Sequence, residues 1–199
     1  MKKVTLFLGV LLISVSIGAQ SFKEKVFKNA QTYHDYMTAQ NFDGILDYMY
    51  PKVFEMAPKA DMKAGMEQMF NSPGMKIEFL SNEVTRVTDE KEVSGITYAA
   101  VFYSSNMKMT FLSELDKPKD DQKSYLDFMK ATMATQFGEQ NVTSDINTMS
   151  LIVHMDATMF AIQDPQYEGL KFIGNDDAMT TVVNAIIPES VRTDLLKTE

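Results

Sequence analysis

The hydrophobic positions of the first third of the chain, after an apolar N-terminal stretch, recur every three or four residues. This spacing is typical of amphipathic helices and predicts one from about residue 22 to 38, with Phe22, Val26, Ala30, Tyr33 and Met37 on its apolar stripe. A short second helix is expected at 45–49, because residue 50 precedes a proline and is disfavoured in the helical region. A third helix is expected at 59–70, with its methionines buried.

After residues 71–74, which read Asn-Ser-Pro-Gly, the apolar period changes from 3.6 to 2, as expected for strands. Residues 84–88 and 93–103 are expected to form a hairpin joined at 89–92. Both faces of 93–103 are largely uncharged, which predicts a central strand covered on both sides. A turn is expected at Asn106. Further strands are expected at 75–80, 107–112, 142–144, 149–155, 157–163 and 170–173.

Helical patterns interrupt and close this series of strands. A helix is expected at 121–137, with Tyr125, Phe128 and Met129 inside, and helical segments are expected at 176–187 and after Pro188. No repeat and no Pro/Gly/Ser-rich linker divides the chain. The sequence therefore predicts one α+β domain over 20–199. Its curved, mainly antiparallel sheet packs around the N-terminal helices and carries extra inserted and C-terminal helices.

The N-terminus has the three parts of a secretory signal peptide. Lys2 and Lys3 precede an apolar stretch at 4–15, and small residues follow, with the expected cleavage between Ala19 and Gln20. The apolar stretch is shorter than the roughly 20 residues that span a bilayer. We therefore expect a signal peptide at 1–19, no membrane insertion after cleavage, and a mature protein in the periplasm or the external medium.

The amino-acid composition excludes several kinds of chemistry and of partner. The chain has no cysteine, which excludes disulfides and thiolate chemistry. Without Lys2 and Lys3 it has 17 basic and 27 acidic residues, a net charge of −10, so no nucleic-acid partner is expected. The 16 methionines raise the question of copper(I). However, Met107 and Met109 fall on an inward strand face, where methionine fills a core or a cavity. We expect no cofactor and no metal.

The order of these elements resembles the nuclear transport factor two-like superfamily, which includes SnoaL-like proteins. The resemblance rests on the connector 41–43, the segment 46–51, the strand pair 159–164 and 170–173, and the final helix at 186–191. It is greatest to small exported bacterial members of unassigned function. The resemblance implies a curved sheet that encloses a cone-shaped apolar cavity. It implies no particular reaction, because this fold carries enzymes, binding proteins and adaptors alike.

The leading functional hypothesis is an exported protein that binds a small apolar or amphipathic ligand in the cone. Its expected lining is aromatic and sulfur-containing: Tyr33, Met37, Tyr103, Met109 and Phe111.

An alternative is an isomerase- or hydratase-like enzyme in which a pocket acid or base acts with a tyrosine. His154 and Asp156, two apart on one strand face, are its candidate acid–base pair. His34 is expected to be a half-exposed helix residue. A third hypothesis is an interaction module that forms a homodimer through the exposed sheet face.

Overall fold

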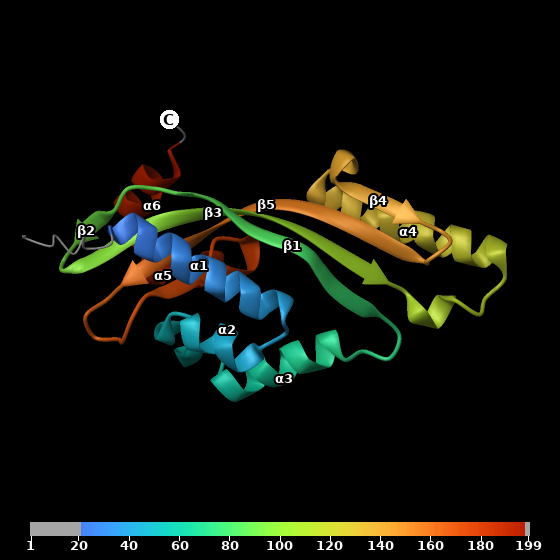
Figure 1. Cartoon of the computed structure of the whole chain (residues 1–199), viewed down its shortest axis with the longest axis horizontal. Coiled ribbons are helices and arrows are strands. Elements are labelled where there is room, and N and C mark those ends of the chain that lie inside the picture. The colour runs from blue at the N-terminus through green and yellow to red at the C-terminus, as the bar shows by residue number, and fades with distance from the viewer. Residues whose placement is uncertain (1–20, 198–199) are drawn as a thin grey trace, which may run out of the picture.

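A curved, open sheet of six strands forms the centre of the molecule in a computed structural model, which describes residues 21–197 (Figure 1). Every strand pair in this part of the chain is antiparallel. The long β3 and β5 are central; β1 and β2 both pair with β3, and β4 and β6 both pair with β5. The strands are β1 (Lys76–Val87), β2 (Lys91–Val93), β3 (Ile96–Thr110), β4 (Val142–Asp145), β5 (Ser150–Gln163) and β6 (Lys171–Gly174).

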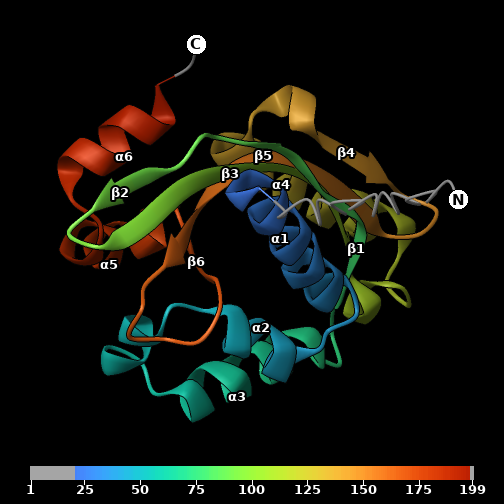
Figure 2. The ribbon, with the colours of Figure 1, turned by 60° about the vertical axis from the view of Figure 1, so that its left-hand side comes forward.

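Helices cover the sheet at both of its ends. The α-helices are α1 (Phe22–Thr38), α2 (Phe42–Tyr48), α3 (Lys59–Phe70), α4 (Lys119–Phe137), α5 (Thr180–Ile186) and α6 (Glu189–Leu196), and a short 3-10 helix, Pro51–Glu55, follows α2. The sheet arches over α1, with α2 and α3 beneath it (Figure 2). The inserted helix α4 packs at the far end of the sheet (Figure 1). The predicted α+β fold class is confirmed.

Three apolar clusters fill the space between the helices and the sheet. One lies under α5 and α6, a second lies under α1, and a third lies under α4. Strands β3 and β5 contribute buried residues to all three, for example Ala100, Val101 and Met109 from β3. The two central strands are therefore the common framework of the core.

Both edges of the sheet are irregular. The register of β1 against β3 shifts between Phe79 and Ser81 and again between Val84 and Arg86. On β1, the backbone N–H of Val84 donates to the side chain of Gln31 from α1, and the same side chain donates to the carbonyl of Asn82, both at 3.1 Å. On the other side, β4 pairs with 150–153 and β6 with 159–162. Residues 154–158 of β5 lie between them and pair with neither.

The structure corrects several predicted strand boundaries. The hairpin turn lies at Ser94 and Gly95, both with positive φ, and not at 89–92, where β2 already begins. Asn106 lies inside β3 and makes no turn, because its side chain bonds across the sheet to Ser81 and His154. The two strands expected at 149–155 and 157–163 are one strand, β5.

Two predicted helix faces are also wrong. No residue of α3 is fully buried, and Met69 is 47% exposed, because α3 packs mainly on α2 and meets the sheet only at its end, where Phe70 lies against Phe79 of β1. In α4, Leu126 is buried but Phe128 is 66% exposed. The two residues are about 200° apart around a helix, so both cannot face the same sheet.

The expected signal peptide at 1–19 lies outside the described residues. Within residues 21–197, no helix has both the length and the apolar character needed to cross a membrane.

Candidate functional site

A buried histidine lies where the sheet arches over α1. His34 is only 1% exposed, and within the described structure neither of its ring nitrogens has a hydrogen-bond partner. Its ring centroid is 4.4 Å from that of Tyr103 on β3 and 5.5 Å from that of Tyr33 on α1. The prediction of a half-exposed His34 is therefore wrong, because the curved sheet covers a wider arc of α1 than the apolar stripe alone.

Burial determines the charge state of this histidine. It lowers the pKa of His34 to about 4, against the opposing effect of the Asp35 carboxylate. The imidazole is therefore neutral at pH 7, with one nitrogen a donor and the other an acceptor. Burial, followed by the nearby Tyr103 and Asp176, raises the pKa of Tyr33, and burial followed by Asp176 raises that of Tyr103. Both phenols therefore keep their protons and remain hydrogen-bond donors.

A second unsatisfied polar group lies on the neighbouring strand. Asn82 of β1 is 7% exposed, and its Oδ1 has no hydrogen-bond partner among the described residues. It pairs in register with Ser105, which lies two residues beyond Tyr103 and on the same face of β3. A buried polar atom without a partner costs about 1–3 kcal/mol. Such atoms mark a place where a bound water or ligand would be stabilised.

Aromatic rings flank these polar groups. Tyr33 lies 6.4 Å from Tyr48 of α2 and 5.7 Å from Phe172 of β6, measured between ring centroids. Tyr48 and Phe172 are in turn 5.8 Å apart. We call this group the concave site. It consists of His34, Tyr33 and Tyr103, the rings of Tyr48 and Phe172, and Asn82, which lies further along the same face of the sheet.

The structure brings together two of the five predicted pocket residues, Tyr33 and Tyr103. Met37 is half-buried near the end of α1. Met109 and Phe111 are buried in the cluster under α4, with exposures of 5% and 2%, away from the cluster that contains Tyr33 and Tyr103. His34 was missed as a site residue because it lies one position off the apolar stripe. An imidazole beside Tyr33 was the only signal in the sequence.

His154 and Asp156 lie on the opposite face of the sheet from Leu151 and Val153, which are fully buried. Their closest side-chain atoms, Nε2 and Oδ2, are 3.6 Å apart. The other ring nitrogen of His154, Nδ1, lies 3.1 Å from Oδ1 of Asn106. The structure therefore brings the pair together, but on an open face where the side chain of Asp156 is 79% exposed.

A buried carboxylate was also missed. Asp164, directly after β5, is 2% exposed, and its Oδ2 accepts a 2.7 Å hydrogen bond from the hydroxyl of Tyr50. Burial, then this hydrogen bond and the charge of Asp164, raise the pKa of Tyr50. Asp164 lines a hollow of about 260 Å³ together with Lys25 and Tyr167. In the sequence, Asp164-Pro165 signals only a break between strands.

No cluster of three or more His, Asp or Glu side chains that could hold a metal occurs within residues 21–197. No protein-family model, curated protein or solved structure matches the chain. The resemblance to the nuclear transport factor two-like superfamily therefore stays a prediction.

Proposed function

We propose that this protein works outside the cytoplasm and binds a small neutral ligand, apolar or amphipathic, at the concave site. The observation that supports the proposal is a set of three buried polar atoms that have no hydrogen-bond partner within residues 21–197: both ring nitrogens of His34 and Oδ1 of Asn82. A ligand that hydrogen-bonds to them would remove the cost of leaving them unpaired. The aromatic rings beside them suit the apolar part of the same ligand.

The charge state of His34 determines which hydrogen-bonding groups the ligand can carry. A neutral His34 offers one donor and one acceptor, and Asn82 offers a further acceptor. A hydroxyl, an amide or an un-ionised carboxyl group matches this pattern, because each both donates and accepts. A charged group would have to leave water without an opposite charge on His34 to balance it, which is costly in a buried site.

Native mass spectrometry tests this proposal on residues 20–199 purified from the periplasm without refolding. We expect an adduct of small-molecule mass that dissociates on denaturation. The adduct should be lost in His34→Leu, which removes both ring nitrogens and keeps an apolar side chain. It should persist in His154→Leu, which removes the only other histidine of the chain.

Two other results of the mass measurement would contradict the proposal. A bare monomer would leave ordered water as the partner of His34. A bare dimer would favour the third hypothesis, an interaction module that pairs through its sheet face.

The enzyme alternative has one observation in its favour. The 2.7 Å contact between Tyr50 and Asp164 places a buried phenol directly behind a carboxylate that lines a hollow. A carboxylate can act as a general base, and a phenol can donate a hydrogen bond to a developing oxyanion.

Deuterium incorporation into a panel of enolisable ketones in D₂O, followed by NMR, tests this activity. Incorporation should be lost in Asp164→Asn and reduced in Tyr50→Phe. It should be unchanged in Tyr125→Phe, which removes a phenol on α4. A wild-type protein that incorporates no deuterium into any ketone of the panel would argue against this candidate.

A further inference from the structure

A second group of polar residues lies on the other face of the sheet, around Arg86. The register shift in β1 places Arg86 opposite Phe102 of β3, whereas regular alternation from Val84 would put its side chain on the core face. Its guanidinium carbon lies 3.9 Å from the centre of the Phe102 ring. Phe102 itself packs against the cluster under α5 and α6. The bulge and the fixed ring therefore hold an exposed cation in one orientation.

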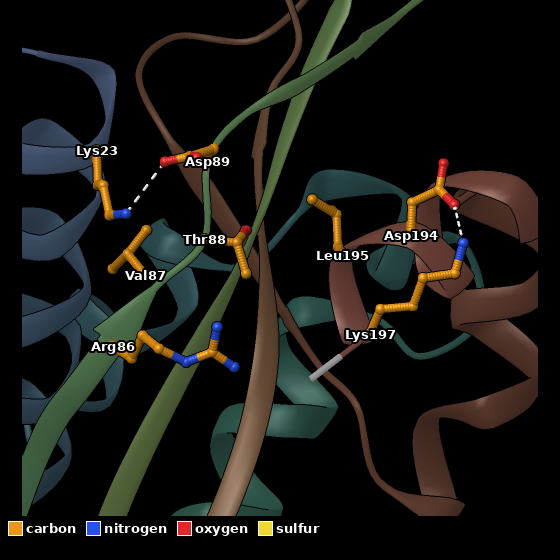
Figure 3. A pocket seen from close by; sticks show the side chains of 8 residues that line it. All are labelled: Lys23, Arg86, Val87, Thr88, Asp89, Asp194, Leu195 and Lys197. Atoms are coloured by element: carbon orange, nitrogen blue, oxygen red, sulfur yellow. Dashed lines mark hydrogen bonds and ion pairs between the residues drawn. The ribbon is translucent and has the colours of Figure 1, made fainter. Parts of the chain in front are cut away.

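The charges around Arg86 are otherwise paired. On one side it borders a hollow of about 480 Å³ between β1 and the end of α6. Figure 3 shows the two lysines of this hollow bonded to carboxylates, Lys23 to Asp89 at 3.1 Å and Lys197 to Asp194 at 2.8 Å. Arg86 lies between them and has no ion pair among residues 21–197. Among the described residues that line this hollow, Arg86 is therefore the one cation without a carboxylate partner.

On its other side, Arg86 borders a hollow of about 310 Å³ that crosses β1, β3 and β5. Thr158 of β5 pairs in register with Phe102, and Asp156 lies two residues further along on the same face. The guanidinium above Phe102 and the exposed Asp156 carboxylate thus border one hollow, and no ion pair joins them within residues 21–197. The nearest basic partner of Asp156 there is His154, whose Nε2 is 3.6 Å from Oδ2 of Asp156.

We propose that this hollow binds the amino and carboxylate groups of an α-amino acid, the carboxylate on Arg86 and the ammonium group on Asp156. A carboxylate forms its strongest hydrogen bonds with a guanidinium, and an ammonium group forms them with a carboxylate. An α-amino acid carries both groups on one carbon, so it can contact two oppositely charged side chains that border the same hollow. The hydroxyl of Thr158 is a further hydrogen-bonding group in the same hollow.

The pair of opposite charges also selects against simpler ions. A plain anion would meet Asp156 in a protein whose net charge is −8. A plain cation would meet Arg86. Only a ligand that carries both charges satisfies both side chains. This site lies on the opposite face of the sheet from the concave site and does not depend on the function proposed for it.

Titrations with glycine, L-alanine, acetate and methylammonium, followed in ¹H–¹⁵N spectra of residues 20–199, test this site. We expect both amino acids to cause saturable shifts at residues 85–87, 102–103 and 156–158. Acetate and methylammonium should cause no saturable shift at the same concentrations. Arg86→Gln and Asp156→Asn should each weaken amino acid binding at least tenfold. Both side chains are exposed, so the remaining resonances should stay in place.

Lys197→Gln is the matched control, because it removes a cation from the neighbouring hollow, and binding should stay within about twofold of wild type. Saturation by acetate, with an affinity that Asp156→Asn does not reduce, would show a simple anion site and overturn the proposal. An absence of saturable shifts with either amino acid would overturn it as well.

Discussion

At the scale of single residues, His34 shows that a curved sheet can bury a helix position that lies off the apolar stripe. The helical period put Tyr33 on the apolar stripe of α1, and Tyr33 does pack against the core cluster under this helix. The next residue, about 100° further around the helix, should have been half-exposed. It is buried because β3 curves over α1 and brings Tyr103 against it. Sheet curvature depends on bulges, and no residue pattern in this sequence marked the positions of those bulges in advance.

The shape of the sheet also explains why the predicted pocket residues lie in two different clusters. Tyr103 and Met109 have the same parity on β3, so alternation correctly put them on one pleat face. Strands twist, and over the length of β3 that face turns from α1 toward α4. Residue parity was thus predictable from the sequence, but the helix that each position meets was not.

The lowered pKa of His34 leads to a prediction about acid stability. The unfolded chain binds a proton at His34 near pH 6.5, whereas the folded chain does so only near pH 4. The free energy of unfolding should therefore fall as the pH falls from about 6.5 to about 4. The contribution of His34 is on the order of 3 kcal/mol. Urea unfolding of wild type and His34→Leu at pH 7 and pH 4 measures this contribution as a difference between the two proteins.

His34→Leu should match or exceed wild-type stability at pH 7, because it removes unpaired buried nitrogens. Its advantage should grow at pH 4. His154→Leu is the control, since the part of the pH dependence that it shares with wild type and that His34→Leu lacks belongs to His34. Equal pH dependence in wild type and His34→Leu would show that the folded protein binds the proton at His34 without cost.

At the scale of elements, the sequence predicted the number and kind of the main segments better than their ends. The helix at 22–38 agrees with α1 at both ends, helped by Ser21, whose side chain forms a capping box with Glu24. The predicted strands were shorter than the observed ones. Asn106 is a turn-forming residue by type, but here its amide bridges two neighbouring strands. A hydrogen bond to a residue 48 positions away cannot be predicted from the residues around Asn106.

The hairpin turn between β2 and β3 gives an element-scale prediction. Gly95 has φ of +79°, a conformation that a side chain disfavours by about 1–2 kcal/mol. Gly95→Ala should therefore lower the melting temperature by roughly 2–8 °C, at 2–4 °C per kcal/mol for a chain of this size. Thermal unfolding followed by circular dichroism measures the change.

Gly65→Ala is the matched substitution in a helix. Gly65 lies within α3, and a Cβ there would meet no atom within 4 Å. Alanine is more favourable than glycine in a helix by about 0.8–1.0 kcal/mol, so this variant should melt a few degrees higher. Melting shifts of the same sign in both variants would contradict this interpretation of Gly95.

At the scale of the whole molecule, the three apolar clusters are joined by β3 and β5. Leu126 of α4 and Ile187 after α5 lie in different clusters, and both are almost completely buried. Truncation of a buried leucine or isoleucine to alanine costs about 2–5 kcal/mol. Because the clusters share two continuous strands, each of Leu126→Ala and Ile187→Ala should shift one common unfolding transition.

Urea unfolding followed by circular dichroism and by tyrosine fluorescence should give the same midpoint in each variant. Tyrosine is a suitable probe because the chain has eight tyrosines and no tryptophan. Separate midpoints for the two probes, or two transitions in Leu126→Ala, would show that the part covered by α4 unfolds independently.

The irregular edges of the sheet have a consequence for the behaviour of this protein at high concentration. An exposed strand edge is a template on which a second chain can add a strand and begin to aggregate. Here the amide of Gln31 occupies backbone groups of β1, and two bulges break the line of that edge. On the opposite side, β4 and β6 leave only the short segment 154–158 between them. In the part of the chain that the structure describes, neither edge offers a long straight row of free backbone groups. We therefore expect this chain, which has no disulfides, to resist fibril formation in spite of its 14- and 15-residue strands.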